Sequence, residues 1–561
     1  MDSAIPYDLG HNGEAAPMRP PLGHRFAVAL RAAALIGLIA AVAPARASSQ
    51  DLQVGDALEQ YIRVLQVDGL VKGPSFFLRP LLNGALADSV GPWAGNLGVA
   101  PTHALGAARW VLDPARLRVS NNSAIPFGQN DDAMWQGHGM NFALDAGATL
   151  QWGALTVTAH PTLVYAQNQP FALAPVKVAG ASQYEYPWWP IDLPQRFGPN
   201  AYVRLDPGQS SVALAVRGAK LSFGTENLWW GPGIQTSILM TNDAPGFPHA
   251  SLATSLPWDI GIGTLEGQWI WGGLQQSAWY TGPDAGQGRF FTGAEVAFSP
   301  AWSFLKGLTV GGSRVFNRNV PTGGLSASDY LAVFQLPFKQ SLATAADPTG
   351  EDQRDQILSF NWRWVLPASG FEMYGEWARN DHSWNLTDFI LEPEHSQAYS
   401  LGFQKVASVA PGQILAVNGE LTHLERDPTL QIRDDPIYYT NGKVPRGYTQ
   451  LGQMIGSALG PGGDGQYLGA DLYADWGRLG IFGQRQVHDN DAFYQLRAAA
   501  AGDTLIAHDV SFSVGGRAMV FMQGIEAQFN VALTKELNRY MQLRNSVWNE
   551  YLGVTLGWRS R

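Results

Sequence analysis

Two adjacent tryptophans, Trp229 and Trp230, stand in the part of the chain that is richest in side chains able to bind a sugar. Flat indole rings stack on the apolar faces of pyranose rings, and carboxylate and amide groups hydrogen bond to sugar hydroxyls. The first interpretation of the pair is therefore a platform that binds a sugar. The alternative is that the two tryptophans shape a loop or a barrel rim. This alternative arises because neighbouring side chains of a strand point to opposite faces, and because residues 231–233 (Gly-Pro-Gly) would end a strand here. The polar candidates beside the tryptophans are Glu226, Asn227, Asn242 and Asp243.

A second candidate cluster of the same kind precedes this segment. Trp188 and Trp189 are again adjacent, and Arg196 follows them closely in the chain. We include these three residues in the set expected to contact a ligand.

The sequence holds carboxylates and histidines but no pattern that predicts catalysis or metal binding. A glycosidase needs two carboxylates about 5 to 9 Å apart across the scissile bond, and spacing along the chain cannot establish that distance. No His-x-x-x-His spacing accompanies the 11 histidines, and no Gly-x-Ser-x-Gly motif with a triad order stands out. We therefore expect no catalytic residue, no metal and no cofactor. The carboxylates that we expect to be solvated include Glu226, Glu372, Glu376, Glu392 and Glu394.

Charge and composition exclude further classes of function. The net charge is −10, and it becomes −11 without residues 1–47, which hold four arginines and three acidic side chains. This charge argues against a nucleic-acid partner. The chain has no cysteine, which excludes disulfides, thiolate catalysis and Cys-ligated metals. A content of 63 Gly, 20 Trp, 18 Tyr and 25 Phe suits the turns and aromatic girdles of a membrane β-barrel.

Residues 1–47 are expected to be a signal peptide region that is absent from the mature chain. Basic residues precede an apolar stretch at 32–42, which ends at the small-residue site 45–47, so the mature chain should begin near Ser48. Acidic residues before Met18 do not suit a signal, and we expect translation to start at Met18. No later window approaches the roughly 20 apolar residues of a membrane helix.

Residues 48–115 are expected to form a small N-terminal helical element, either periplasmic or folded into the mouth of a barrel. Four apolar residues at spacings of three and four follow Asp56, a possible helix cap. More helix is expected between Leu81 and Leu112. The apolar residues with helical spacing are Leu58, Tyr61, Ile62 and Leu65.

From residue 116 to residue 561 the pattern predicts an all-β fold, a large antiparallel transmembrane β-barrel. Apolar and polar residues alternate over 140–152 and 155–165, each long enough to cross a membrane as a tilted strand. Short turns alternate with long polar loops, as expected for tight periplasmic turns and elaborated extracellular loops. At about 25 residues per strand and loop, on the order of 18 strands are expected. The long loops are 167–209, 320–355, 381–395 and 425–466.

Seven short motifs stand out in the sequence, at 226–233, 242–248, 186–190, 191–198, 392–395, 447–450 and 460–463. Together they resemble the signature of the capsule assembly Wzi family of outer-membrane proteins. The resemblance implies a monomeric barrel with a periplasmic helical element, which acts as a lectin and holds capsular or extracellular polysaccharide at the surface of a Gram-negative cell. Outer-membrane lipid and the polysaccharide export machinery are the further partners that it implies.

The rival hypothesis keeps the fold and changes the function to that of a passive or substrate-selective porin. Charged side chains inside a barrel usually face water, so inward-facing arginines could line a channel. They could equally pair with aspartates in a plugged lumen. The two functions differ in whether the helical element and loops such as 188–198 and 229–248 close the pore. The charged residues considered are Arg217, Arg314, Arg363, Arg379, Arg485, Asp145, Asp471 and Asp475.

Overall fold

A computed structural model describes most of the chain within one compact unit, Ala45–Arg561. The expected signal peptide, residues 1–47, lies outside the described residues. Among the described residues, no helix is long and apolar enough to cross a membrane. The described ranges are 51–82, 90–96, 102–336, 338–342, 353–380, 383–426, 437–499 and 506–558.

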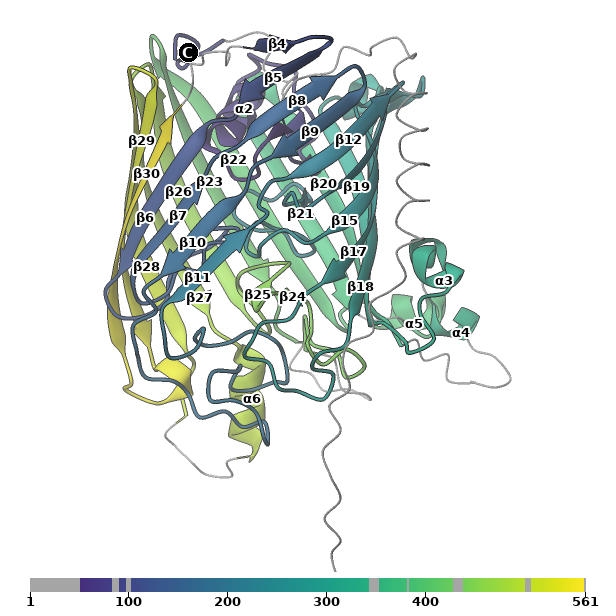
Figure 1. Cartoon of the computed structure of the whole chain (residues 1–561), viewed down its shortest axis with the longest axis vertical. Helices are drawn as coiled ribbons and strands as arrows, with labels where there is room; N and C mark the ends of the chain where they lie inside the picture. Colours follow the sequence, from purple (N-terminus) through teal and green to yellow (C-terminus); the bar gives the residue numbers. More distant parts are fainter. Residues whose placement is uncertain are drawn as a thin grey trace, which may run out of the picture. The chain divides into compact units, whose positions relative to one another are not determined.

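Most of this unit is one antiparallel sheet of 24 labelled strands, which curves round a lumen in Figure 1. The last strand pairs with β6, so the ladder returns to its beginning. The strands are β4 (His103–Leu105), β5 (Ala108–Leu112), β6 (Ala115–Asn122), β7 (Gly139–Asp145), β8 (Ala148–Trp152), β9 (Leu155–Ala159), β10 (Thr162–Ala166), β11 (Tyr202–Asp206), β12 (Ser211–Val216), β13 (Ala219–Gly224), β15 (His249–Thr254), β16 (Trp258–Asp259), β17 (Gly263–Leu274), β18 (Arg289–Pro300), β19 (Leu308–Asn319), β20 (Asp355–Leu366), β21 (Phe371–Asn380), β22 (Gln397–Ala410), β23 (Gln413–His423), β26 (Asp464–Ala474), β27 (Gly477–Val487), β28 (Val510–Met522), β29 (Ile525–Leu537) and β30 (Val547–Trp558).

Five pairs of consecutive strands continue each other across a short break: β5/β6, β7/β8, β9/β10, β11/β12 and β15/β16. Since β4 only extends the wall through a short hairpin with β5, the 24 labelled strands amount to 18 wall strands. The expected barrel of about 18 strands is therefore confirmed.

The alternation of the sequence places polar side chains in the lumen and apolar ones outside. In β30, Leu552 and Val554 are 56% and 36% exposed, whereas Asn549 is buried. In β20, Phe360 is half exposed between the buried Ser359 and Asn361. This is the reverse of a soluble protein and is typical of a barrel whose outer face contacts lipid.

The two ends of the barrel differ as expected. Short turns such as 153–154, 217–218 and 411–412 lie at the end that holds the last strand's carboxyl terminus, at the top of Figure 1. The long loops lie at the other end, with the helices α3 (Ala327–Tyr330), α4 (Lys339–Leu342), α5 (Leu386–Leu391) and α6 (Asn490–Ala499). By the rule for outer-membrane barrels, the first end is periplasmic and the second extracellular.

The N-terminal element lies inside the periplasmic half of the barrel. Helix α2 (Ala57–Val67) begins after Asp56, whose Oδ1 accepts a hydrogen bond from the backbone N–H of Leu58 at 3.2 Å. The ring of Tyr61 stacks on Trp93 with centroids 4.2 Å apart and contacts Tyr473 of the wall. The predicted helix and its cap are confirmed. The wall side chains that pack against this element are Val365, Val406, Ile414, Ala416, Tyr473 and Met519.

The expectation of further helix between Leu81 and Leu112 is wrong for the described residues. That stretch holds the two-residue strand β3 (Leu81–Leu82), which pairs with β1 (Asp51–Leu52), and the hairpin β4–β5. The alternating residues of β5 pair with β8, because the partner strand and not local propensity decides the conformation here. The sheet thus begins before residue 116.

Two extracellular loops fold inward and fill the other half of the lumen: residues 225–248, and the described residues 424–426 and 437–463 of the second loop. Tyr439 and Tyr448 stack on each other and donate hydrogen bonds to the carbonyls of Ile238 and Leu239 at 2.7 and 2.9 Å. The buried apolar residues that these loops contribute to one cluster are Leu228, Trp230, Ile238, Leu239, Met240, Phe247, Leu424, Tyr438, Tyr439, Tyr448, Met454 and Ile455. A further short hairpin, β24 (Thr449–Gln450) with β25 (Gln453–Met454), lies in the second loop.

The N-terminal element and the inward loop 225–248 meet inside the barrel. Strand β2 (Leu78–Arg79) of the N-terminal element pairs with β14 (Trp229–Trp230) of the inward loop. Arg79 donates to the carbonyls of Gly231 and Gly233 at 3.2 and 2.8 Å, and Arg63 donates to the carbonyl of Pro232 at 2.7 Å. The periplasmic and extracellular segments therefore form one continuous plug.

Wall charges hold this plug in place. The expectation that Glu372 and Glu376 are solvated is wrong, because both are buried in the lumen. The carboxylate of Glu372 is fully buried between Arg63 Nε at 2.6 Å and Arg363 Nε at 2.7 Å. We expect Glu372→Gln to lower the free energy of unfolding by about 3 to 5 kcal/mol, because it leaves two buried guanidinium groups without their anion. Urea unfolding of the detergent-solubilised barrel measures this change. The matched variant Glu550→Gln, on an exposed side chain of β30, should change it by less than about 0.5 kcal/mol, and equal effects of the two would contradict this role.

Candidate functional site

The extracellular loops bring aromatic and polar side chains together on a surface that we call the crown: residues 171–189, 489–496, 506–508 and 539–541. Its centre is Asp489, which precedes α6 and caps it, since Oδ1 accepts a hydrogen bond from the N–H of Ala492 at 3.0 Å. The other oxygen, Oδ2, accepts from Tyr186 Oη at 2.7 Å and from Trp189 Nε1 at 2.8 Å. Burial and the neighbouring Asp491 raise the pKa of Asp489 to about 7.

Trp188 and Trp189 are only partly buried in the crown. They pack against a small apolar cluster of α6 and its neighbours, which includes Phe493 and Met541. The ammonium group of the exposed Lys177 lies 5.5 Å from the centroid of the Trp188 ring. Because both indoles stay partly exposed here beside charged groups, this surface has the chemistry of a sugar-binding platform.

More aromatic residues continue the crown. The guanidinium group of Arg539 lies over the rings of Phe171 at 5.2 Å and Tyr540 at 4.4 Å. Tyr540 Oη donates to the carbonyl of Ala172 at 2.8 Å, which ties residues 538–546 to the loop that carries the two tryptophans.

Trp229 and Trp230 have a different role from Trp188 and Trp189. They are 2% and 0% exposed, inside the plug. The guanidinium group of Arg79 covers the Trp229 ring at 4.2 Å, and Trp230 Nε1 donates to Gln268 Oε1 at 2.8 Å. Neither ring offers a free face, so the structure favours the loop-shaping role, the second of the two roles that the sequence left open.

The polar residues beside this pair mostly hydrogen bond within the protein. Asn227 Nδ2 donates to the carbonyl of Ala244 at 2.7 Å, and Asn242 Nδ2 donates to the carbonyls of Val54 and Asn130, each at 3.3 Å. Glu226 differs, because its Oε2 is buried without a hydrogen-bond donor among the described residues.

Asp243 also lies in the plug and accepts a hydrogen bond on Oδ1 from the N–H of Asn130 at 3.2 Å. Burial raises its pKa to about 7, and the nearby charge of Asp131 adds to the shift. Arg196 is buried and donates to the carbonyls of Asn168 and Pro199 at 2.6 and 3.1 Å, which closes the base of its loop. The structure thus brings Trp188 and Trp189 together on the crown and separates them from the other candidates.

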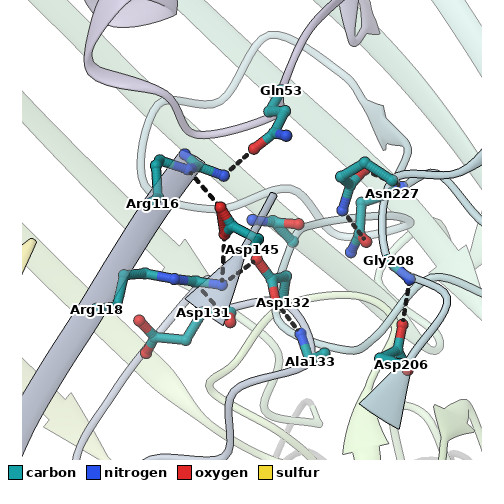
Figure 2. A network of polar contacts seen from close by, with 12 residues as sticks. Gln53, Arg116, Arg118, Asp131, Asp132, Ala133, Asp145, Asp206, Gly208 and Asn227 are labelled. Atoms are coloured by element: carbon teal, nitrogen blue, oxygen red, sulfur yellow. Dashed lines mark hydrogen bonds and ion pairs between the residues drawn. The ribbon is translucent and has the colours of Figure 1, made fainter. Parts of the chain in front are cut away.

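A polar network joins the plug to the wall, as Figure 2 shows. Asp145 of β7 accepts from Arg116 Nε at 3.2 Å, and Arg116 also donates to Gln53 of the N-terminal element. Arg118 Nη2 binds Asp132 at 2.9 Å, so the loop after β6 joins the same network. The charged residues considered for a channel include members of such pairs: Asp145 here, Arg363 with Glu372, and Asp471 with Arg517 at 2.7 Å. Arg217 and Asp475, both considered for a channel lining, instead lie exposed in turns of the chain.

Sequence reasoning missed Asp489 and the partnership of Tyr186 with it. Tyr186 stands in the motif at 186–190, but nothing in the spacing of the chain points to Asp489, which lies about 300 residues further on.

Comparison with known proteins agrees with this architecture. The family model described as capsule assembly protein Wzi matches residues 114–475. Among solved structures, Escherichia coli Wzi, titled an outer membrane protein involved in group 1 capsule assembly and a carbohydrate binding β-barrel, aligns with 90% of this chain and 99% of its own. The TM-score of 0.57 at 13% identity shows a shared fold.

Two Pseudomonas aeruginosa structures resemble the chain more weakly. OccK2 (OpdF) has a TM-score of 0.40 and 9% identity over 82% of this chain and 99% of its own. OccK5 (OpdH) has a TM-score of 0.39 and 10% identity over 81% and 98%. Scores below 0.5 carry no weight for fold or function. No curated protein matches the chain.

The raised pKa of Asp243 predicts a pH-dependent stability. Its ordinary pKa is 3.8, so between about pH 4 and pH 7 the unfolded chain loses this proton while the folded one keeps it. The stability contributed by the protonated side chain is complete below pH 4 and is lost as the pH rises through 7. Asp243→Asn, which keeps the acceptor for Asn130, should gain stability relative to wild type between pH 5 and pH 8 in urea unfolding. A gain of the same size in Asp475→Asn, at an exposed turn, would contradict this assignment.

Proposed function

The chain belongs to the capsule assembly protein Wzi family, and on this premise we propose that it is an outer-membrane lectin that binds capsular or related extracellular polysaccharide at the cell surface. It binds the polymer and does not cleave it. The signal peptide at 1–47, with translation from Met18, would bring the chain to the outer membrane, where the barrel acts as a monomer. Polymer would reach it from the polysaccharide export machinery.

The observation that carries this proposal is the continuous plug. The pairing of β2 with β14 and the hydrogen bonds from Arg79 and Arg63 to the carbonyls of residues 231–233 occupy the middle of the lumen. A passive porin needs an aqueous path at this level, whereas a lectin needs only a surface. The plug therefore favours binding at the extracellular face over transport through the barrel.

Within the crown, Trp188 and Trp189 are the side chains that we propose to contact the polymer. The hydrogen bond from Trp189 Nε1 to Asp489 fixes one ring, and Lys177 lies beside the other, where it suits an acidic sugar. Arg196 holds the base of the loop that carries the two tryptophans. The inward loop holds the other candidates, which are buried or bonded within the plug, so we do not propose them as polymer contacts: Glu226, Asn227, Trp229, Trp230, Asn242 and Asp243. Each sugar hydroxyl contributes about 1 kcal/mol, so retention depends on repeated contacts along a polymer.

A glycan pull-down with the surface polysaccharide of the source cell tests the site. Wild-type barrel in detergent should retain the polymer, and the Trp188→Ala/Trp189→Ala double variant should lose at least about 90% of this retention, since two stacking contacts of roughly 1 kcal/mol each disappear. The matched control is Trp302→Ala/Trp476→Ala, which removes two exposed tryptophans at the periplasmic end. Loss of retention in a folded Trp229→Ala/Trp230→Ala variant, with none in the crown variant, would place the site at the inner loop instead.

Single-channel conductance distinguishes the lectin from the porin. In a planar bilayer, wild-type barrel should conduct almost no ions, because the N-terminal element and the inward loop occupy the middle of the lumen. Steady conductance of the size found for open porins, together with no retention of polymer, would replace the lectin by the porin.

A further inference from the structure

Three side chains with metal-binding groups meet at the extracellular rim, outside the crown. His423 is the last residue of β23, Asp464 is the first residue of β26, and Glu425 follows two residues after His423. One ligand atom from each lies within 4.8 Å of the others, and His423 Nδ1 is 2.7 Å from Asp464 Oδ1. From this geometry we propose that the triad His423–Glu425–Asp464 binds a divalent transition-metal ion of the Zn²⁺ or Mn²⁺ class.

Strand register creates the triad. β23 and β26 are antiparallel neighbours, and His423 pairs with Asp464, so their side chains stand next to each other on one face. Leu421, two residues earlier in β23, is 41% exposed on the lipid-facing side, which places His423 on the outer face as well. The ring of Tyr399 in β22 packs against His423 with centroids 5.0 Å apart and limits its rotation.

A fourth carboxylate beside the triad points to a missing positive charge. Asp491, in the first turn of α6, is 2% exposed, and its Oδ1 accepts from the N–H of Arg426 at 3.0 Å. Its Oδ2 is buried and has no hydrogen-bond donor among the described residues. A buried carboxylate oxygen without a donor costs free energy, and a nearby cation would offset this cost.

The charges and the ligand types agree on the kind of ion. With the ion bound and its ligands deprotonated, Glu425, Asp464 and Asp491 would carry three negative charges beside a neutral His423. Among the described residues, Arg426 is the cation that opposes them. A divalent ion would bring this group to neutrality. An imidazole nitrogen with carboxylate oxygens suits Zn²⁺ or Mn²⁺, whereas Ca²⁺ and Mg²⁺ prefer sites made of oxygen alone.

The ion would stiffen the rim next to the crown. It would bridge the end of β23 and the start of β26, and so fix both ends of the loop between them, whose described residues 437–463 pack in the lumen. Asp491 lies two residues after Asp489, the anchor of Trp189, so this rim is continuous with the crown. The metal site stands independently of the proposed lectin function.

Metal binding to the full-length barrel tests the proposal. Chelator-treated protein in detergent is titrated with Mn²⁺ and with Zn²⁺, followed by electron paramagnetic resonance for Mn²⁺ and by calorimetry for Zn²⁺. Wild type should bind about one equivalent, and His423→Ala/Asp464→Asn should bind at least about 10-fold more weakly. The matched control, His103→Ala/Asp475→Asn, changes a histidine and an aspartate that are exposed near the periplasmic end and should bind as wild type does.

Stability provides a second measurement, because an ion that binds only the folded state raises the unfolding temperature. Zn²⁺ should raise it for wild type and for the control, and not for Glu425→Gln, a near-isosteric variant that serves if the double variant does not fold. No bound ion in wild type, or equal binding and equal stabilisation in the folded triad variants, would overturn the proposal.

Discussion

The fold depends on how the positive charges of its buried arginines are compensated. A guanidinium group keeps its charge under all ordinary conditions, so each one inside the lumen must be matched by an anion or by carbonyl oxygens. Arg63 shares Glu372 with Arg363, and Arg79 binds Glu59 at 2.9 Å. The remaining donors of Arg63 and Arg79 reach the carbonyls of the inward loop, so this requirement sets where the N-terminal element meets residues 231–233.

Alternation alone predicted most of the wall. Inside a bilayer every backbone group must be paired, which forces a closed arrangement of strands and makes the period of two a reliable signal. The spacing of Leu58, Tyr61, Ile62 and Leu65 likewise predicted α2 with its cap at Asp56. The hairpin β4–β5 was not predicted, because a strand as short as the five-residue β5 carries little signal in its own sequence. The conformation of β5 comes from its pairing with β8.

The site was harder to predict, since it depends on contacts between distant residues. The sequence singled out both tryptophan pairs but could not tell that one pair is buried under Arg79 and the other lies on the crown. The same holds for Arg196, whose carbonyl partners are set by a loop conformation. His423 and Asp464 become neighbours only through strand register, which no spacing rule for metal ligands describes.

The continuous plug also has a mechanical consequence. A polymer anchored outside a cell is dragged by flow, and the pull reaches the loops that hold it. Here the loop that carries Trp188 and Trp189 is joined to the plug, because the N–H of Asp192 donates to the carbonyl of Arg446 at 3.1 Å. Tyr439 of the same inward loop donates to the carbonyl of Ile238 in the other inward loop, which Arg63 bonds in turn, and Glu372 ties Arg63 to the wall. Tension applied at the cell surface would therefore be shared by strands around the barrel and by the helix at its far end. A surface loop without these connections would bear the load alone and would unfold first.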